Sequence, residues 1–163
     1  ILPEFNINLS DKLGNISNDE IYTFLQGTCD EPWQLKYRGG FQDIFYVTTL
    51  DRTPEQINLV KSLTNLEIGV YIQPLAQGNC VHCEFNLFYD PSKVNLDKVK
   101  EDYLKISREL MKKGAFFHRP YGLWADDVYS MVSDEVVDAL KKLKAIFDPN
   151  NVMKPGNLCF KEE

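Results

Sequence analysis

Residues 81–118 read VHCEFNLFYDPSKVNLDKVKEDYLKISRELMKKGAFFH, and this stretch decides the fold class. Val81 to Tyr89 is rich in aromatic and β-branched residues, which favours a strand. Asn95 then stands at the N-cap of a helix, and Gly114 stands at its C′ position. Ala115 to His118 begins a further strand. The stretch therefore predicts a strand–helix–strand unit.

The same pattern occurs about 40 residues earlier in the chain. Phe41 to Thr49 predicts a strand, and Thr53 is the expected N-cap of a helix, with Gln56 completing a capping box. Ile68 to Leu75 predicts the next strand. Two successive units of this kind are typical of a split βαβ, ferredoxin-like fold. We therefore expect an α+β protein, with an antiparallel sheet that has helices on one face.

A third helix and a closing loop follow these two units. Ser133 is the expected N-cap, and the apolar residues expected to face inward are Val136, Val137, Leu140, Leu143 and Phe147. Residues 148–151 have the composition of a type I turn, and Lys154-Pro155-Gly156 predicts a second turn. At the other end, residues 1 to about 30 read as a connecting segment with one short helix, Asn18 to Gln26.

Composition limits the partners of this chain of 163 residues. Its formal charge of −6 and pI near 5.0 argue against nucleic acid and against an anionic membrane surface. No apolar run approaches the ~20 residues of a membrane span. The few cysteines and the lack of a signal peptide favour a reducing compartment, and we expect a cytoplasmic protein. The start at Ile1 suggests a processed chain, a domain or a fragment.

Alternation along residues 81–89 separates two sets of side chains. Cys83 lies on an apolar face, whereas His82, Glu84 and Asn86 share the other face. This polar set either meets water or lines a polar site. A metal site built from His82, Glu84 and His118 has no recognised ligand spacing, and we predict no metal.

The segment Phe116 to Gly122, FFHRPYG, is the second candidate for chemistry. A strand that ends in Arg119 and turns at once can aim a guanidinium into a cavity, where its permanent charge stabilises a developing anion. His118 and Tyr121 flank it as further catalytic candidates. A surface arginine at a strand end is the alternative. Trp124 is expected in the core.

Residues 115–130, AFFHRPYGLWADDVYS, and residues 147–157, FDPNNVMKPGN, together resemble the C-terminal region of FAD-linked oxidases of the vanillyl-alcohol oxidase and p-cresol methylhydroxylase family. The resemblance implies a connecting segment over 1–35 and a ferredoxin-like cap domain for the substrate over 36–125. It also implies a C-terminal helix and closing segment over 126–163. FAD would be bound mainly by a domain that is not in this chain, either in the same precursor or in a second chain.

The resemblance also implies roles for individual residues. Arg119 matches an arginine beside the flavin and the phenolic substrate, whereas His118 stands where relatives often have a tyrosine. His82, or Cys83 beside it, corresponds to a position from which some members attach FAD. Asn157 stands where relatives commonly have a lysine that contacts the flavin.

We therefore expect the substrate-binding part of an FAD-dependent oxidoreductase that moves a hydride from a 4-alkylphenol or aromatic alcohol to flavin. Alone, this chain would be inactive, and it could form a homo-oligomer. One alternative is an FAD-linked D-lactate or D-2-hydroxy-acid dehydrogenase, with His82, Glu84 and Asn86 at the substrate. The other alternative is a non-catalytic ferredoxin-like binding module.

Overall fold

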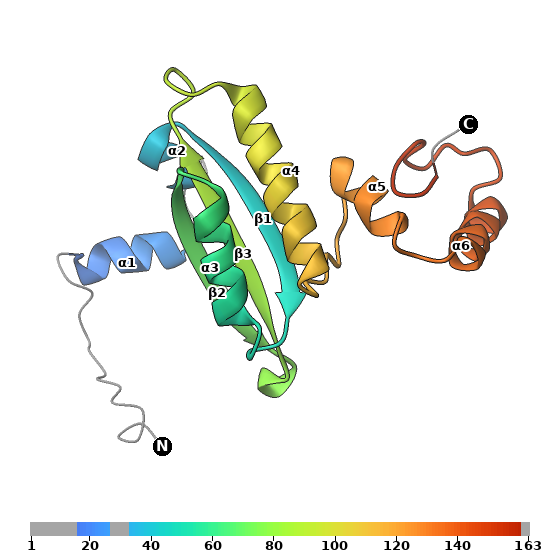
Figure 1. The fold of residues 1–163 in the computed structure, drawn as a ribbon, viewed down its shortest axis with the longest axis horizontal. Helices are drawn as coiled ribbons and strands as arrows, with labels where there is room; N and C mark the ends of the chain where they lie inside the picture. Colours follow the sequence, from blue (N-terminus) through green and yellow to red (C-terminus); the bar gives the residue numbers. More distant parts are fainter. Residues whose placement is uncertain (1–15, 27–32, 161–163) are drawn as a thin grey trace.

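The computed structural model describes residues 16–26 and 33–160, and it shows an α+β chain with a small antiparallel sheet (Figure 1). The elements in chain order are α1 (Asn18–Leu25), α2 (Trp33–Arg38), β1 (Gly40–Thr48), α3 (Thr53–Leu63), β2 (Glu67–Leu75), the 3-10 turn η2 (Ala76–Gly78), β3 (Cys80–Tyr89), α4 (Leu96–Lys112), α5 (Leu123–Tyr129) and α6 (Asp134–Phe147). The first three predicted strands are thus confirmed to within one residue at each end, and so are the helix between the first two (α3) and the helix after the third (α4).

The sheet has the order β1-β3-β2, so β3 is its central strand and both pairings are antiparallel. The prediction of a fourth strand at residues 115–118 is wrong. It forms a single bridge, in which Val47 and Phe116 exchange two backbone hydrogen bonds of 2.9 and 2.8 Å. Pro120 follows closely and has no N–H to continue a ladder. The arrangement is consistent with a ferredoxin-like one.

Helices α3 and α4 cover one face of the sheet, and the core lies between them and the strands (Figure 1). The fully buried side chains there include Ile44, Tyr46, Val60, Val81, Phe85, Leu87, Ile106 and Leu110. Asn95 caps α4 as predicted, since its Oδ1 accepts from the backbone N–H of Asp97 at 2.8 Å. Gly114 ends the helix with a φ of 78°, a conformation that glycine adopts without strain.

The capping box predicted for α3 is wrong. Thr53 is the first residue of the helix rather than its cap, and its hydroxyl donates to the carbonyl of Thr49 at 3.1 Å. Gln56 is completely buried and donates to the carbonyl of Lys113 at 3.2 Å. The side chain of Gln56 therefore forms a tertiary hydrogen bond to the end of α4 instead of completing a local capping box.

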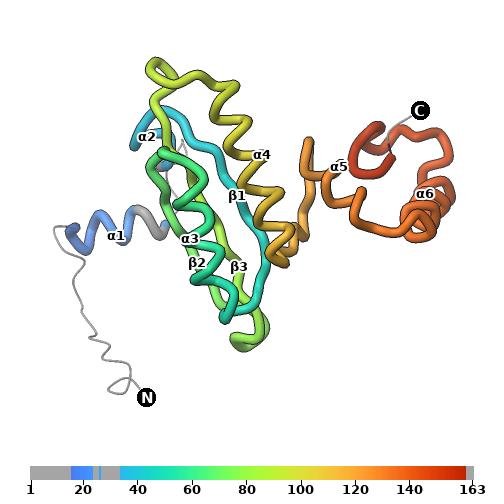
Figure 2. The backbone as a smooth tube through the Cα atoms, viewed as in Figure 1, coloured from blue at the N-terminus to red at the C-terminus, as the bar shows by residue number. Residues whose placement is uncertain are grey.

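Helices α5 and α6 and the closing segment lie to one side of the sheet and its two helices (Figure 2). The apolar side of α6 does not face a core within the described chain, which corrects the expectation that it points inward. Val136 and Leu143 are about half exposed, and Phe147 is 75% exposed. The two turns of the closing segment are confirmed: Asn151 N–H donates to the Asp148 carbonyl, and Asn157 N–H donates to the Lys154 carbonyl.

The predicted N-terminal helix is confirmed as α1, whereas most of the predicted connecting segment falls outside the described residues. Helix α2 was not predicted. It packs at one end of the sheet, where the ring of Tyr37 meets Phe88 edge-on at a centroid distance of 5.1 Å. Arg38 forms an ion pair with Glu67 on the edge strand β2 at 2.7 Å.

Candidate functional site

The face of the sheet opposite α3 and α4 carries the polar residues of β3. Strand register places Phe45 of β1 and Tyr71 of β2 on either side of Glu84, and it pairs Val47 with His82. Side chains of directly paired residues point to the same face. The predicted alternation along β3 is confirmed, because Cys83 is fully buried on the helix side and His82 and Glu84 are partly exposed on the other face. Asn86 lies on that other face too, but it is buried, with 4% of its surface exposed.

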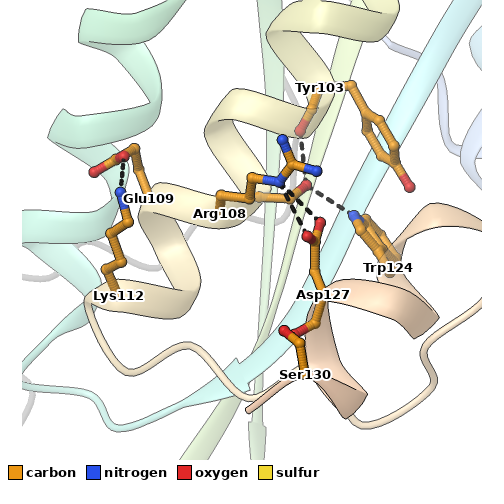
Figure 3. A network of polar contacts seen from close by, with 8 residues as sticks. Tyr103, Arg108, Glu109, Lys112, Trp124, Asp127 and Ser130 are labelled. Atoms are coloured by element: carbon orange, nitrogen blue, oxygen red, sulfur yellow. Dashed lines mark hydrogen bonds and ion pairs between the residues drawn. The ribbon is translucent and has the colours of Figure 1, made fainter.

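Helix α5 is fixed to α4 by a buried polar contact, which in turn fixes the segment before it (Figure 3). The indole Nε1–H of Trp124 donates to the hydroxyl of Ser107 at 2.8 Å, and that hydroxyl donates to the carbonyl of Tyr103 at 2.7 Å. At the surface, Arg108 Nε lies 3.1 and 3.0 Å from the two carboxylate oxygens of Asp127. Trp124 is completely buried, as predicted.

Phe45 is the aromatic centre of the cluster that results. Its ring meets Trp124 edge-on at a centroid distance of 5.2 Å and stacks on Tyr121 at 6.0 Å. The imidazoles of His118 and His82 lie 6.2 and 6.3 Å from the same ring. One half-buried side chain of β1 thus joins residues from β3, from the segment after α4 and from α5. We call these five residues, together with Arg119, the Phe45 cluster.

The cationic part of the cluster is Arg119. Its Cζ lies 4.9 Å from the centroid of the Phe45 ring, a cation–π geometry, and its Nε donates to His118 Nε2 at 3.1 Å. The pKa of His118 is lowered by burial, by the charge of Arg119 and by His82. His118 is therefore held as a neutral acceptor, and among the described residues no carboxylate pairs with Arg119. The guanidinium keeps its charge available for a ligand.

An acidic part lies next to it on the same face. Glu84 Oε2 is 3.8 Å from His82 Nε2, and Glu84 Oε1 accepts from the side-chain amide of Asn86 at 3.0 Å. The pKa of the Asp43 carboxyl is raised by burial and by the charge of Glu84. Asp43 stands opposite Asn86 in the register, so two carboxylates share this part of the face.

The structure brings together six of the residues predicted from sequence: His82, Glu84, Asn86, His118, Arg119 and Tyr121. It does not bring Cys83 to them, because that thiol lies under the helices, beside Tyr46 and Thr53. Asn157 is also apart from them, in the closing segment, where it lines a cavity together with Tyr121.

Sequence reasoning missed Phe45 and Asp43. Both lie in a strand that was predicted correctly, and alternation from the buried Ile44 and Tyr46 would have placed them on the uncovered face. Their importance comes from the strands beside them rather than from any local motif. The pattern of residues within one strand does not show which other strand will pair with it.

The closing segment is organised by the carboxylate of Asp148. It accepts from the backbone N–H groups of Val152 and Met153 at 2.8 and 2.9 Å, and it forms an ion pair with Lys144 of α6. These contacts keep the pKa of Asp148 below its usual value, with the Lys144 bond as the largest cause. The predicted turn therefore has a charged side chain at its centre.

Chemically, the uncovered face offers a permanent cation, a neutral imidazole and an aromatic platform for a planar, electron-rich or anionic group.

In the part of the chain that the structure describes, no three His, Cys, Asp or Glu side chains gather closely enough to hold a metal ion. No helix within residues 16–26 and 33–160 is long and apolar enough to cross a membrane. Comparison of the chain with protein families, with curated proteins and with solved structures gave no match.

Proposed function

We propose that this chain is the substrate-binding cap part of an FAD-dependent oxidoreductase, in which the Phe45 cluster faces the flavin and an aromatic substrate. The single observation that supports this most is the guanidinium of Arg119, which lies over an aromatic ring on an uncovered face without a carboxylate partner among the described residues. Bound flavin would supply the hydride acceptor. The chain's own residues would hold a phenolate substrate and stabilise its charge.

The order of elements supports a ferredoxin-like cap. The bridge at Phe116 lies beside β1, so the segment after α4 occupies the position of a fourth strand in the order 4-1-3-2. Such a sheet has one face for helices and one face free for a ligand or another domain. Here the free face is the one that carries His82 and Arg119.

The residues present fit a flavin on this face only in part. Arg119 and His82 lie on the uncovered side and would contact it, whereas Cys83 is buried below and cannot reach it without unpacking the core. We assign most of the FAD contacts to a domain outside this chain. The exposed apolar side of α6 supports such a partner, because monomeric proteins rarely leave an apolar stripe of this kind uncovered.

The test begins with the absorption spectrum of the protein isolated from its native source with whatever co-purifies. A band near ~450 nm is expected for bound oxidised flavin. Turnover of 4-alkylphenols should then be measured for wild type, for Arg119→Ala and for Arg38→Ala, a matched arginine at the other end of the sheet. We expect Arg119→Ala to abolish turnover and Arg38→Ala to retain it. Phenol oxidation that survives Arg119→Ala would refute the assignment of Arg119.

A second candidate is an FAD-linked D-2-hydroxy-acid dehydrogenase, which the close grouping of His82, Glu84 and Asn86 favours. Turnover of D-lactate in place of 4-alkylphenols would select it. A colourless, partner-free and stable protein would instead identify a non-catalytic binding module.

A further inference from the structure

A cavity of about 490 Å³ lies between the segment after Arg119 and the closing segment. Its size is within the range of small-molecule sites. Most of its lining is apolar or aromatic: Pro120, Tyr121, Phe147, Met153, Leu158 and Phe160. Aromatic rings from three separate segments therefore line one pocket, which is open to solvent.

The charges around this cavity do not cancel. Lys144 lines it but is neutralised by Asp148, and it also donates to the carbonyl of Met153 at 3.0 Å. Lys154 lines it too, and among the described residues no carboxylate pairs with its ammonium. Among the described residues of the lining, Asp148 is the only acid, so these residues together carry one uncompensated positive charge. Asn157 adds an amide beside Lys154.

We propose that this cavity binds a small aromatic anion, with its ring against Tyr121, Phe147 and Phe160 and its anionic group toward Lys154. A flat ring buries apolar surface against the aromatic walls, while its carboxylate can pair with the ammonium of Lys154. A neutral ligand would gain nothing from the exposed ammonium of Lys154, and the second charge of a dianion would find no further free cation among the described lining residues. This proposal does not rest on flavin chemistry.

The cavity adjoins the Phe45 cluster through one residue. Tyr121 forms its wall and also stacks on Phe45, and its ring lies 4.9 Å from that of Trp124. Binding in the cavity should therefore change the fluorescence of Trp124, which is followed in a Trp33→Phe background because Trp33 also emits. This gives a direct reporter that requires neither a flavin nor turnover.

The test is a titration of the isolated protein with 2-naphthoate and with its neutral analogue 2-naphthamide, followed by calorimetry and by tryptophan fluorescence. We expect saturable 1:1 binding of naphthoate, about twofold to fivefold tighter than naphthamide, as an ion pair to an exposed lysine would give. Lys154→Gln should remove the difference between the two ligands. Lys142→Gln, an exposed α6 lysine outside the cavity, should leave it unchanged.

A second pair of variants tests the aromatic wall. Phe147 and Ile146 are about equally exposed, at 75% and 73%, but only Phe147 lines the cavity. Phe147→Ala should weaken naphthoate binding severalfold, whereas Ile146→Ala should not. Because both side chains are exposed, neither change should unfold the chain.

The proposal is overturned if naphthoate does not bind, or if it binds no tighter than naphthamide and is insensitive to Lys154→Gln. It is also overturned if an isolated fragment of this chain binds naphthoate but the intact protein does not, since a docked segment would then fill the cavity. A colourless preparation that still binds naphthoate would count against the flavin proposal alone.

Discussion

The guanidinium of Arg119 lies over the ring of Phe45, with its Cζ 4.9 Å from the ring centroid. The two residues are far apart in the chain, and they meet because the segment after α4 bridges to β1 at Val47, two residues from Phe45. The same ring contacts both histidines of the chain. The contact of Arg119 with Phe45 thus defines the centre of the candidate site.

Replacing Phe45 with Ala should destabilise the protein by about 1–3 kcal/mol, because the change removes a half-buried ring and its aromatic partners. Urea denaturation monitored by Trp124 fluorescence measures this loss. The matched control is Phe116→Ala, since Phe116 is 64% exposed. Equal destabilisation by the two changes would show that Phe45 does not organise the cluster.

Replacing Ser107 with Ala should cost about 1–3 kcal/mol, because the buried indole N–H of Trp124 would lose its acceptor. Trp124→Phe removes the donor, and in that background Ser107→Ala should cost less. A double-mutant cycle on the free energy of unfolding measures the coupling between them. Strictly additive effects would contradict a direct hydrogen bond between these two side chains.

Replacing Arg119 with Gln should raise the pKa of His118, because the charge of Arg119 is one of the causes that lower it. The imidazole signals followed by NMR during a pH titration give this value directly. Arg108→Gln is a suitable control, since Arg108 pairs with Asp127 at the α4–α5 contact. If the pKa of His118 were the same in Arg119→Gln as in wild type, the guanidinium would not lie beside this imidazole in solution.

Stability should fall as the pH falls through the titration range of His118. The pKa of His118 is lowered from its usual 6.5 in the folded protein, so the unfolded chain takes up the proton first. The stabilising contribution of neutral His118 is therefore present above pH 6.5 and is lost as the pH falls through the folded pKa. The charged or titratable groups that lower the pKa of His118 are Arg119 and His82, and the carboxylate of Glu84 lies 3.8 Å from His82.

The urea midpoint of wild type and of His118→Gln, compared from about pH 8 to about pH 5, isolates this contribution. The wild type should lose more stability over this range than the variant does. Identical pH profiles would show that His118 titrates alike in the folded and unfolded chain.

Replacing Asp148 with Ala should loosen the closing segment without unfolding the sheet. The change removes the acceptor of two backbone N–H groups and the ion-pair partner of Lys144. Hydrogen exchange should accelerate at Val152 and Met153 and stay unchanged in β3. Asp138→Ala, within the preceding helix α6, serves as the control. Faster exchange throughout the chain would mean that the closing segment supports the whole fold.

Much of the fold was predictable because its signals are local. Asn95 and Gly114 bound α4 by backbone chemistry that involves only neighbouring residues. The capping box at Thr53 was predicted wrongly because the partner of Gln56 is not local: its side chain donates to the carbonyl of Lys113, far away in the chain. The inward orientation predicted for α6 was wrong. An apolar stripe indicates that one side of a helix packs against something, but it does not identify the packing partner.

By itself, the sequence determined the three paired strands, the long helices, the two closing turns and the separation of His82, Glu84 and Asn86 from Cys83. All of these follow from dihedral preferences and from periodicities of two or 3.6 residues, which act within a few residues. Only the tertiary structure decided that Phe45 and Asp43 join these residues and that the thiol of Cys83 lies beneath the helices. It also decided that Tyr121 separates the Phe45 cluster from a cavity. Strand register and the docking of α5 on Ser107 set these relationships, and both depend on contacts between segments distant in the chain.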